Sequence, residues 1–189
     1  RALGQRPGLA AVIVGTLAVA LAANAVIFNL ADALYLRPFR FPDVDRLIVV
    51  ASDASGDKPY FDRESVAAAD YRDWTRALTT VQQLAALEWW DPNLSGVERP
   101  ESLHGFLVTP GYFELLRVEP ILGRTFTDGD GRPNANRKVI LSHALWQRRF
   151  SADPAVLGTT MRLEGVPHEI VGAMPARFAV PYGSEVWAP

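Results

Sequence analysis

The longest apolar stretch of the chain runs from Leu9 to Leu30, with the sequence LAAVIVGTLAVALAANAVIFNL. It contains no charged residue, and its only polar side chains are those of Thr16, Asn24 and Asn29. At a helical rise of about 1.5 Å per residue, the stretch is long enough to cross a hydrocarbon layer about 30 Å thick. The pattern therefore predicts a membrane-spanning helix preceded by a short basic segment.

One face of this predicted helix carries only small or amide side chains, at alternating spacings of three and four residues. The members of this small-residue stripe are Gly8, Ala11, Gly15, Ala18, Ala22, Ala25 and Asn29. Every other heptad phase includes a bulky apolar residue. Small residues let two helix backbones approach closely within a membrane, so the stripe predicts a partner helix, either another span of the same protein or a second copy. A high alanine content offers a competing explanation.

A secretory signal peptide is an alternative interpretation of the same region. The basic segment Arg1–Arg6, the apolar residues Leu9–Leu17 and an Ala-x-Ala site at Ala20–Ala22 or Ala23–Ala25 would fit that pattern. The apolar run continues past both sites through Val26–Leu30, which favours an anchor that is retained. Both interpretations place the remainder of the chain outside the cytoplasm.

After Pro38 and Pro42 the pattern changes to short apolar runs and stretches of helical periodicity. Strands are predicted at Leu47–Ala51, Val81–Trp90, Glu101–Val108, Val139–Leu141, Thr160–Leu163 and Glu169–Val171, the last two forming a hairpin around Glu164–Pro167. Helices are predicted over Ser65–Leu78, from the cap Thr109 to Leu116, and after the cap Ser142; Ala54–Pro59 is expected to be a loop and Asn93–Gly96 a turn. Strands and helices do not alternate regularly, so the pattern predicts an α+β domain.

Composition excludes several classes of protein. The chain has no cysteine, so it can hold no disulfide, thiolate metal site or cysteine nucleophile. Its net charge of −2 provides no basic surface for nucleic acid. About 150 residues follow the apolar stretch, enough for one ordinary domain or two small ones.

The sequence also lacks the constellations that catalysis requires. His104, His143 and His168 are far apart and do not show the spacing of a metal-binding helix. The stretch Asp128–Arg132 fails as a calcium loop because Arg132 and Val139 occupy the fifth and twelfth positions, where ligands are needed, and Pro133 occupies the sixth, where glycine is needed. Trp89–Pro92 could form an aromatic platform for a sugar or a drug, although core packing explains it equally well. We therefore predict no catalytic, cofactor-binding or metal-binding residue.

Nine short blocks along the chain are jointly specific, although no single one is. They are Ala23–Ala25 with Ile27-Phe28, Leu36–Pro38 with Phe41-Pro42, Asp70–Trp74, Asn93–Gly96, Tyr112-Phe113, Gly123–Phe126, Leu141–Trp146, Asp153–Gly158 and Ile170–Pro175. In this order they resemble the first transmembrane helix and periplasmic core domain of MacB-like, FtsX-like permeases of ABC transporters, especially the duplicated permeases of acidobacteria. Ala67–Ala69 replaces the family's Ser-x-Pro, and Arg117 stands where the family tends to place glycine.

The resemblance implies an organisation. Residues 1–36 would form a cytoplasmic stub and the transmembrane helix, and residues 37–189 an extracytoplasmic MacB-like periplasmic core domain that is truncated at its C-terminus. Within that domain, a porter-like part would cover Leu47 to Leu116 and a small, mostly β insertion Gly123 to Met174. The chain would lie in the bacterial inner membrane with most of its residues in the periplasm.

The resemblance also implies partners and a role. A cytoplasmic ATP-binding cassette ATPase, outside this chain, would hydrolyse ATP and move the external domain, so that the permease exports a substrate by mechanical work without a cofactor of its own. Other transmembrane helices of the permease, a periplasmic adaptor and a second permease unit, as a dimer or pseudo-dimer, are the expected partners. The alternative is an FtsX-like module that signals across the membrane without transport.

Overall fold

The computed structural model describes residues 7–31, 43–50, 66–96, 99–133, 135–178, 180–181 and 183–189. The chain forms two compact units, residues 1–47 and residues 48–189, which we describe separately. The loop expected at Ala54–Pro59 and the helix cap expected at Ser65 lie outside the described residues.

The first unit contains one long helix, α1 (Pro7–Ala31). The described side chains between Ala11 and Phe28 are exposed throughout. These 18 residues are long and apolar enough to cross a membrane, and the whole helix of 25 residues would be about 37 Å long. The structure thus confirms a continuous apolar helix over the predicted stretch. A short 3-10 helix, η3 (Val44–Arg46), follows later in this unit.

The strand expected at Leu47–Ala51 is wrong for the residues that are described there. Leu47 to Val50 pair with no strand in the described parts of the chain, and Ile48 and Val49 are each 71% exposed. An apolar run of this length indicates a strand only if a neighbouring strand accepts its backbone hydrogen bonds.

The first helix of the second unit is α2 (Ala68–Ala77). It begins without a side-chain cap, because Ala67 occupies the N-cap position. Tyr71 and Trp74 are half-buried on the predicted apolar face, and the Tyr71 hydroxyl donates a hydrogen bond to the Leu84 carbonyl over 3.2 Å. The predicted helix is therefore present, but it is shorter than expected.

The rest of the second unit is built on nine short strands. They are β1 (Leu87–Trp89), β2 (Asn93–Ser95), β3 (Glu101–Ser102), β4 (Gly105–Val108), β5 (Leu122–Gly123), β6 (Lys138–Leu141), β7 (Thr160–Leu163), β8 (Val166–Ala173) and β9 (Val186–Ala188). The order across the sheet is β1-β4-β9-β6-β8-β7-β2-β3, and β5 pairs with β8 at Gly172 and Ala173, outside this order. The pairs β4–β9 and β6–β8 are parallel and the others are antiparallel.

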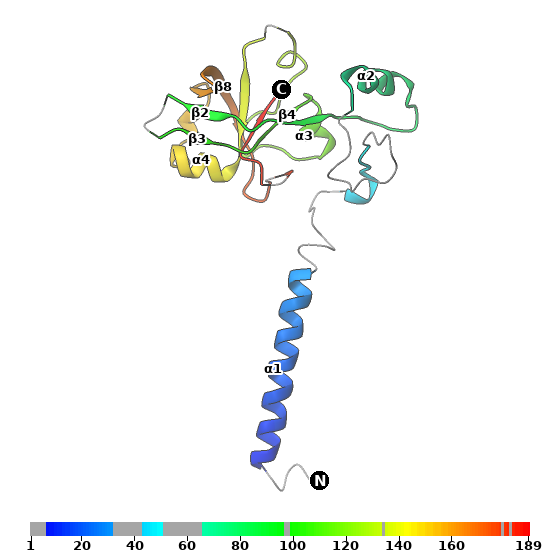
Figure 1. Ribbon diagram of the computed structural model, residues 1–189, viewed down its shortest axis with the longest axis vertical. Coiled ribbons are helices and arrows are strands. Elements are labelled where there is room, and N and C mark those ends of the chain that lie inside the picture. The colour runs from blue at the N-terminus through cyan, green and yellow to red at the C-terminus, as the bar shows by residue number, and fades with distance from the viewer. Residues whose placement is uncertain are drawn as a thin grey trace. The chain divides into compact units, whose positions relative to one another are not determined.

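The sheet closes on itself because each of its end strands, β1 and β3, continues through a bend into a strand at the opposite end of the sheet. β1 leads into β2 and β3 into β4, and hydrogen bonds continue across the bends from the Trp90 amide to the Gly105 carbonyl (3.1 Å) and from the Leu103 amide to the Pro92 carbonyl (3.0 Å). The strands consequently curl around a common interior (Figure 1). Closure of this kind satisfies strand edges that an open sheet would expose.

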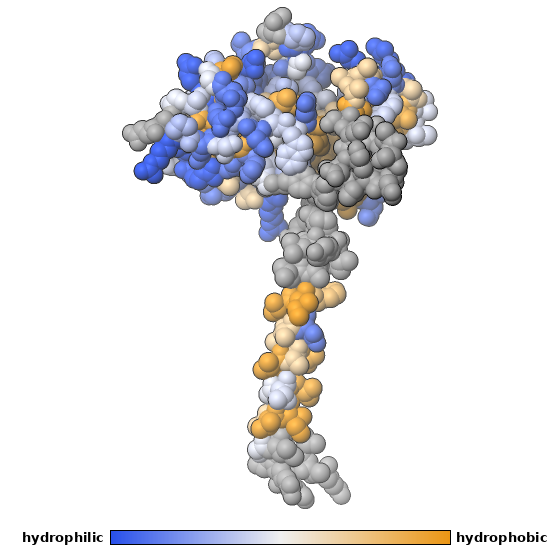
Figure 2. All heavy atoms as spheres, viewed as in Figure 1, coloured by the Kyte–Doolittle hydropathy of each residue, from blue (hydrophilic) through white to orange (hydrophobic). Residues whose placement is uncertain are grey.

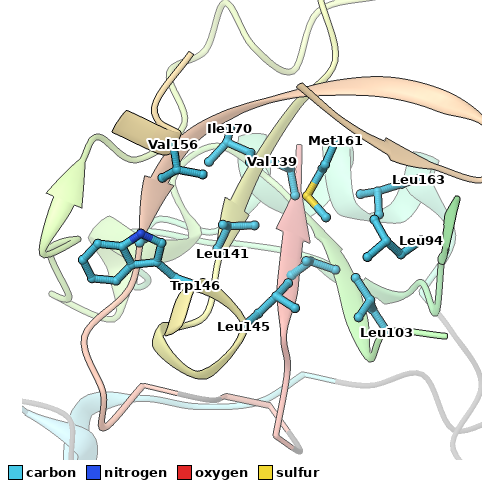
Figure 3. Close-up of a cluster of buried hydrophobic side chains, with 12 residues drawn as sticks. Leu94, Leu103, Val139, Leu141, Leu145, Trp146, Val156, Met161, Leu163 and Ile170 are labelled. Atoms are coloured by element: carbon cyan, nitrogen blue, oxygen red, sulfur yellow. The ribbon is translucent and has the colours of Figure 1, made fainter. Parts of the chain in front are cut away.

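The interior of this ring is a single apolar core. Side chains from β2, β6, β7 and β8 meet those of the helix α4 (His143–Phe150) and the short helix η5 (Pro154–Val156), as Figure 3 shows. The members are Leu94, Leu103, Val139, Leu141, Leu145, Trp146, Val156, Met161, Leu163, Ile170, Ala173 and Val186. Aromatic rings form a second buried group. Trp187, fully buried on β9, has its ring centroid 5.8 Å from that of Phe113 and 5.3 Å from that of Phe178.

Two predictions that depend only on neighbouring residues are confirmed. The Ser142 hydroxyl accepts a hydrogen bond from the Leu145 amide over 3.1 Å and caps α4. β7 and β8 form the predicted hairpin, although the turn is tighter than expected, since only Glu164 and Gly165 separate the strands. Both residues have positive φ, 53° and 74°, as two-residue hairpin turns of this type require.

Other predictions around β1 to β4 need correction. The strand expected at Val81–Trp90 is limited to β1, and the strand expected at Glu101–Val108 is interrupted at Leu103-His104. The turn expected at Asn93–Gly96 is wrong for its first three residues, which form β2 and pair with β3 and β7. β7 lies about 70 residues after β2 in the chain, so no local pattern could reveal that pair.

Thr109 is not a helix cap. Its hydroxyl oxygen accepts a hydrogen bond from the Ala86 amide over 3.0 Å, and the helix α3 (Tyr112–Leu115) begins after Gly111 at the N-cap. Arg117, which stands where the family tends to place glycine, adopts a positive φ of 52°.

Strands from both parts of the expected domain lie in one sheet. β2, from the porter-like part, pairs with β7 from the expected insertion, and β9 lies between β4 and β6. The division at Leu116 and Gly123 therefore remains a prediction, while the sheet continues across it.

Candidate functional site

The helix α1 is the first candidate functional element. Figure 2 shows that its surface is mostly apolar. Soluble domains bury such a surface in a core, whereas every described side chain of α1 between Ala11 and Phe28 is exposed. An apolar environment, as in a lipid bilayer, would satisfy this surface.

The small-residue stripe lies within α1. Gly8, Ala11, Gly15, Ala18, Ala22 and Ala25 are exposed, and Asn29 is helical while its side chain is outside the described residues. A Cβ atom added at Gly8 or Gly15 would meet no atom within 4 Å. The described part of the chain thus brings no partner to the stripe, and its packing role remains a prediction.

The second candidate is a hollow at the end of the sheet where β6 and β8 finish and α4 begins. It has a volume of about 340 Å³. Its lining is His104, Ser142, His143, Ala144, Ala176, Phe178, Gly183, Ser184 and Glu185. Four separate segments contribute these side chains, and the ring of strands brings them together.

The rim of this hollow is held by ion pairs. Arg148, on α4, reaches both Glu185 (2.8 Å) and Glu101 (3.2 Å). These carboxylates raise the pKa of the Arg148 guanidinium, the Glu185 hydrogen bond having the largest effect. The amide of Glu185 donates to the His104 carbonyl over 2.7 Å, so the segment leading into β9 is tied to the bend between β3 and β4. Sequence reasoning missed this network, because none of these residues forms a local motif.

The three histidines are divided by the fold. His104 and His143 both line the hollow, although they are far apart in the sequence, whereas His168 is buried in β8 against Trp90, with ring centroids 5.6 Å apart. Within the described ranges, no group of three or more histidine, aspartate or glutamate side chains is placed to hold a metal ion.

The stretch Asp128–Arg132 has a structural role. The Asp130 carboxylate accepts hydrogen bonds from the guanidinium of Arg124 (2.6 and 3.2 Å) and from both the amide and the hydroxyl of Thr127 (2.8 Å each). These bonds, above all the one from Arg124, hold the pKa of Asp130 well below its usual range. The Asp130 carboxylate therefore holds the loop after β5 in place, and these four hydrogen bonds occupy most of the positions at which its oxygens can accept one.

His168 gives the fold a predictable dependence on pH. Burial lowers the pKa of His168 below its usual value and the nearby charge of Arg137 lowers it further, while the hydrogen bond between Nδ1 and the Val166 carbonyl (3.0 Å) opposes the shift. The unfolded chain, with a pKa of about 6.5, therefore binds this proton more readily. The stabilising contribution of neutral His168 is complete above about pH 6.5 and is lost as the pH falls through the folded-state pKa.

We accordingly expect His168→Gln to reduce the loss of stability on acidification. The measurement is the urea midpoint of the wild-type chain and of the variant at pH 7.5 and pH 5. Since all other titrating groups are shared, a smaller difference between the two pH values in the variant is the expected result. An identical difference in both proteins would contradict the assignment.

Comparison with known proteins shows which family has this arrangement. The family model described as MacB-like periplasmic core domain matches residues 10–189. No curated protein matches the chain. The extracellular domain of the noncanonic ABC-type transporter YknZ from Gram-positive bacteria is similar in structure, with a TM-score of 0.53, 21% sequence identity, and coverage of 66% of this chain and 62% of that one.

The periplasmic region of MacB from Actinobacillus actinomycetemcomitans has a similar structure as well, with a TM-score of 0.58 and 16% identity over 74% of this chain and 62% of that one. At these identities the likeness concerns the fold. The chain spans 62% of the length of each of these two solved domains.

Proposed function

Because the chain belongs to the family of MacB-like periplasmic core domains, we propose that it is the membrane-anchored, extracytoplasmic part of an ABC transporter permease. In this proposal α1 crosses the bacterial inner membrane and residues 37–189 lie in the periplasm. The observation that carries it is that the family match extends from within α1 to the end of β9, joining an exposed apolar helix to a domain with its own core.

The proposed role of the domain is mechanical. ATP hydrolysis by a cytoplasmic ATP-binding cassette ATPase would move the transmembrane helices, and α1 would pass that movement to the external domain and so promote export of a substrate. The closed ring of strands supports such a role, because six of its nine strands pair with a neighbour on both sides and the ring would move as one body. Additional spans, a second permease unit and a periplasmic adaptor are the partners that the proposal requires.

Membrane retention tests the proposal. We expect the expressed chain to remain with the membrane fraction after alkaline carbonate washing and to keep Arg1–Arg6, since α1 is long enough to span the bilayer. Mass spectrometry of the N-terminus provides the decisive reading. A mature protein beginning at Ala23 or Val26 would show instead that the helix is a cleaved signal peptide.

We further propose that the small-residue stripe is the face on which α1 meets another helix. Gly15→Leu or Ala18→Leu would then force the two backbones apart and weaken association by about 1–3 kcal/mol. Ala20→Leu is the matched control, because position 20 lies about 200° around the helix from Ala18 at about 100° per residue. Self-association of the isolated span, or assembly of the whole permease, would be measured in a membrane reporter assay. Equal signals for leucine at positions 15, 18 and 20 would show that the stripe reflects alanine content alone.

A further inference from the structure

The outer edge of β1 has backbone groups that no described strand covers. β1 ends the sheet, and among the described strands it pairs with β4 alone. The Thr109 amide donates a hydrogen bond to the Ala86 carbonyl over 3.0 Å. The Trp90 amide donates to the Gly105 carbonyl over 3.1 Å, so residues 86, 88 and 90 turn their backbone groups to β4. Because these groups alternate along a strand, the N–H and C=O of Leu87 point away from β4, and neither has a partner in the described parts of the chain.

The side chains of β1 are open as well. Leu87 is 49% exposed, and every residue of β1 is exposed. The strand contains neither lysine nor proline, the residues that commonly protect an edge strand from pairing. β3, at the other end of the sheet, has only two residues, and its Glu101 is held by Arg148 over 3.2 Å. β1 is therefore the end of the sheet that can accept a further strand.

A second segment has the complementary deficit. Ile48 to Val50 follow the extended residue Leu47 (φ −86°, ψ 130°), and in the structure they pair with no described strand. Ile48 and Val49 are each 71% exposed, and Val50 is 43% exposed. All three residues are β-branched, and such side chains favour strands. A neighbouring strand would both cover these side chains and accept the backbone hydrogen bonds of the segment.

The helix between the two segments is suited to connect parallel strands. α2 lies between Val50 and Leu87 in the chain, and a helix commonly provides the crossover between two parallel neighbours in a sheet. No residue of α2 is buried. Tyr71 and Trp74 are half-buried, and Leu78, at the C-cap, is 40% exposed. An added strand would give this apolar face of α2 a further surface to pack against.

We propose that Ile48–Val50 docks on the outer edge of β1 as a parallel strand, with Val49 opposite Leu87. In this register the Leu87 amide donates to the Ile48 carbonyl, and the Val50 amide donates to the Leu87 carbonyl. Ile48 is the first residue after the unit that contains α1, so the docked segment would pass a movement of α1 directly to the sheet. The proposal goes beyond the permease function and does not depend on it, because docking is measured without transport.

Disulfide formation between two introduced cysteines tests the docking, since the chain has no cysteine of its own. Neighbouring strands lie about 4.8 Å apart, within the range of about 4.4–6.8 Å between Cα atoms that a disulfide bridges. The double variant Val49→Cys/Leu87→Cys is oxidised in lipid vesicles, and the products are identified on a non-reducing gel and by peptide mapping. Val49→Cys/Ile121→Cys is the matched control, because Ile121 is 51% exposed, similar to Leu87, and directly precedes β5, which pairs with β8.

We expect a disulfide within one chain, formed at least about tenfold faster in the Val49/Leu87 pair than in the control pair, because docking raises the local concentration of the two thiols. Equal rates in the two pairs would overturn the proposal. A disulfide between two chains would overturn it as well, because the segment on the edge of β1 would then belong to a second copy.

A backbone variant shows whether the segment docks as a strand. Val50→Pro removes an amide that makes no hydrogen bond in the described structure but would donate to Leu87 in the docked state. Combined with the Val49/Leu87 cysteine pair, it should lower the rate of disulfide formation to that of the control pair. Thermal melting confirms that the variant is folded. An unchanged rate in the folded variant would show that the two side chains meet without strand pairing and would overturn the proposal.

Discussion

Substitution of Gly123 by alanine is expected to destabilise the domain formed by residues 48–189 by about 3 kcal/mol or more, or to prevent its folding. Gly123 has a φ of 76°, and an added Cβ would lie 2.1 Å from the Val171 carbonyl oxygen and 2.8 Å from a methyl group of Leu157. The left-handed backbone alone costs a non-glycine residue about 1–2 kcal/mol. Relief of the overlap would require β5 to move away from β8, and this would strain the hydrogen bonds that flank it, from Ile121 to Ala173 and from Arg124 to Val171 (2.9 Å each).

Gly158 provides the matched control for this experiment. It has the same φ of 76°, yet an added Cβ would meet no atom within 4 Å. Gly158→Ala therefore isolates the cost of the backbone conformation, and we expect a loss of about 1–2 kcal/mol. The measurement is urea denaturation of both variants beside the wild-type chain. Equal losses at the two positions would show that β5 and β8 do not approach as closely as described.

The elements that could be predicted from the sequence are those specified by neighbouring residues. The apolar length of α1, the cap of Ser142 on α4 and the glycine of the β7–β8 turn each act over a few positions. In such cases the pattern and the geometry have the same cause, since the residue that satisfies the backbone is adjacent to the element it ends or begins.

The elements that could not be predicted depend on distant partners. Asn93–Ser95 has the composition of a turn, but it forms a strand because it pairs with β7. Thr109 has the composition of a helix cap, but the Ala86 amide occupies its hydroxyl oxygen. In both cases a contact between segments far apart in the chain overrides the local preference, as tertiary structure often does.

The candidate site illustrates the same limit. An aromatic platform and core packing explain Trp89–Pro92 equally well from the sequence, and no local pattern indicated that His104, His143 and Glu185 would line one hollow. Those residues meet only because β4, β6, β8 and β9 belong to one closed ring. The small-residue stripe has the opposite status, since its spacing is evident in the sequence while its packing role remains a prediction.

The proposed position of residues 37–189 outside the cytoplasm is directly measurable, because the chain contains no cysteine. A single cysteine can be introduced as Gly129→Cys, where the glycine lies outside the left-handed region and the nearest atom to an added Cβ is the Thr127 hydroxyl at 3.6 Å. Ala2→Cys, on the other side of α1 in the sequence, is the control.

Both variants are treated in intact cells with a membrane-impermeant maleimide, and then again after permeabilisation. We expect the cysteine at position 129 to be labelled completely in intact cells, because residues 37–189 would face the periplasm. The cysteine at position 2 should react only after permeabilisation, because the basic segment before α1 would remain in the cytoplasm. Protection of position 129 in intact cells, with labelling only after permeabilisation, would contradict the proposal that this is the extracytoplasmic domain of a transporter permease.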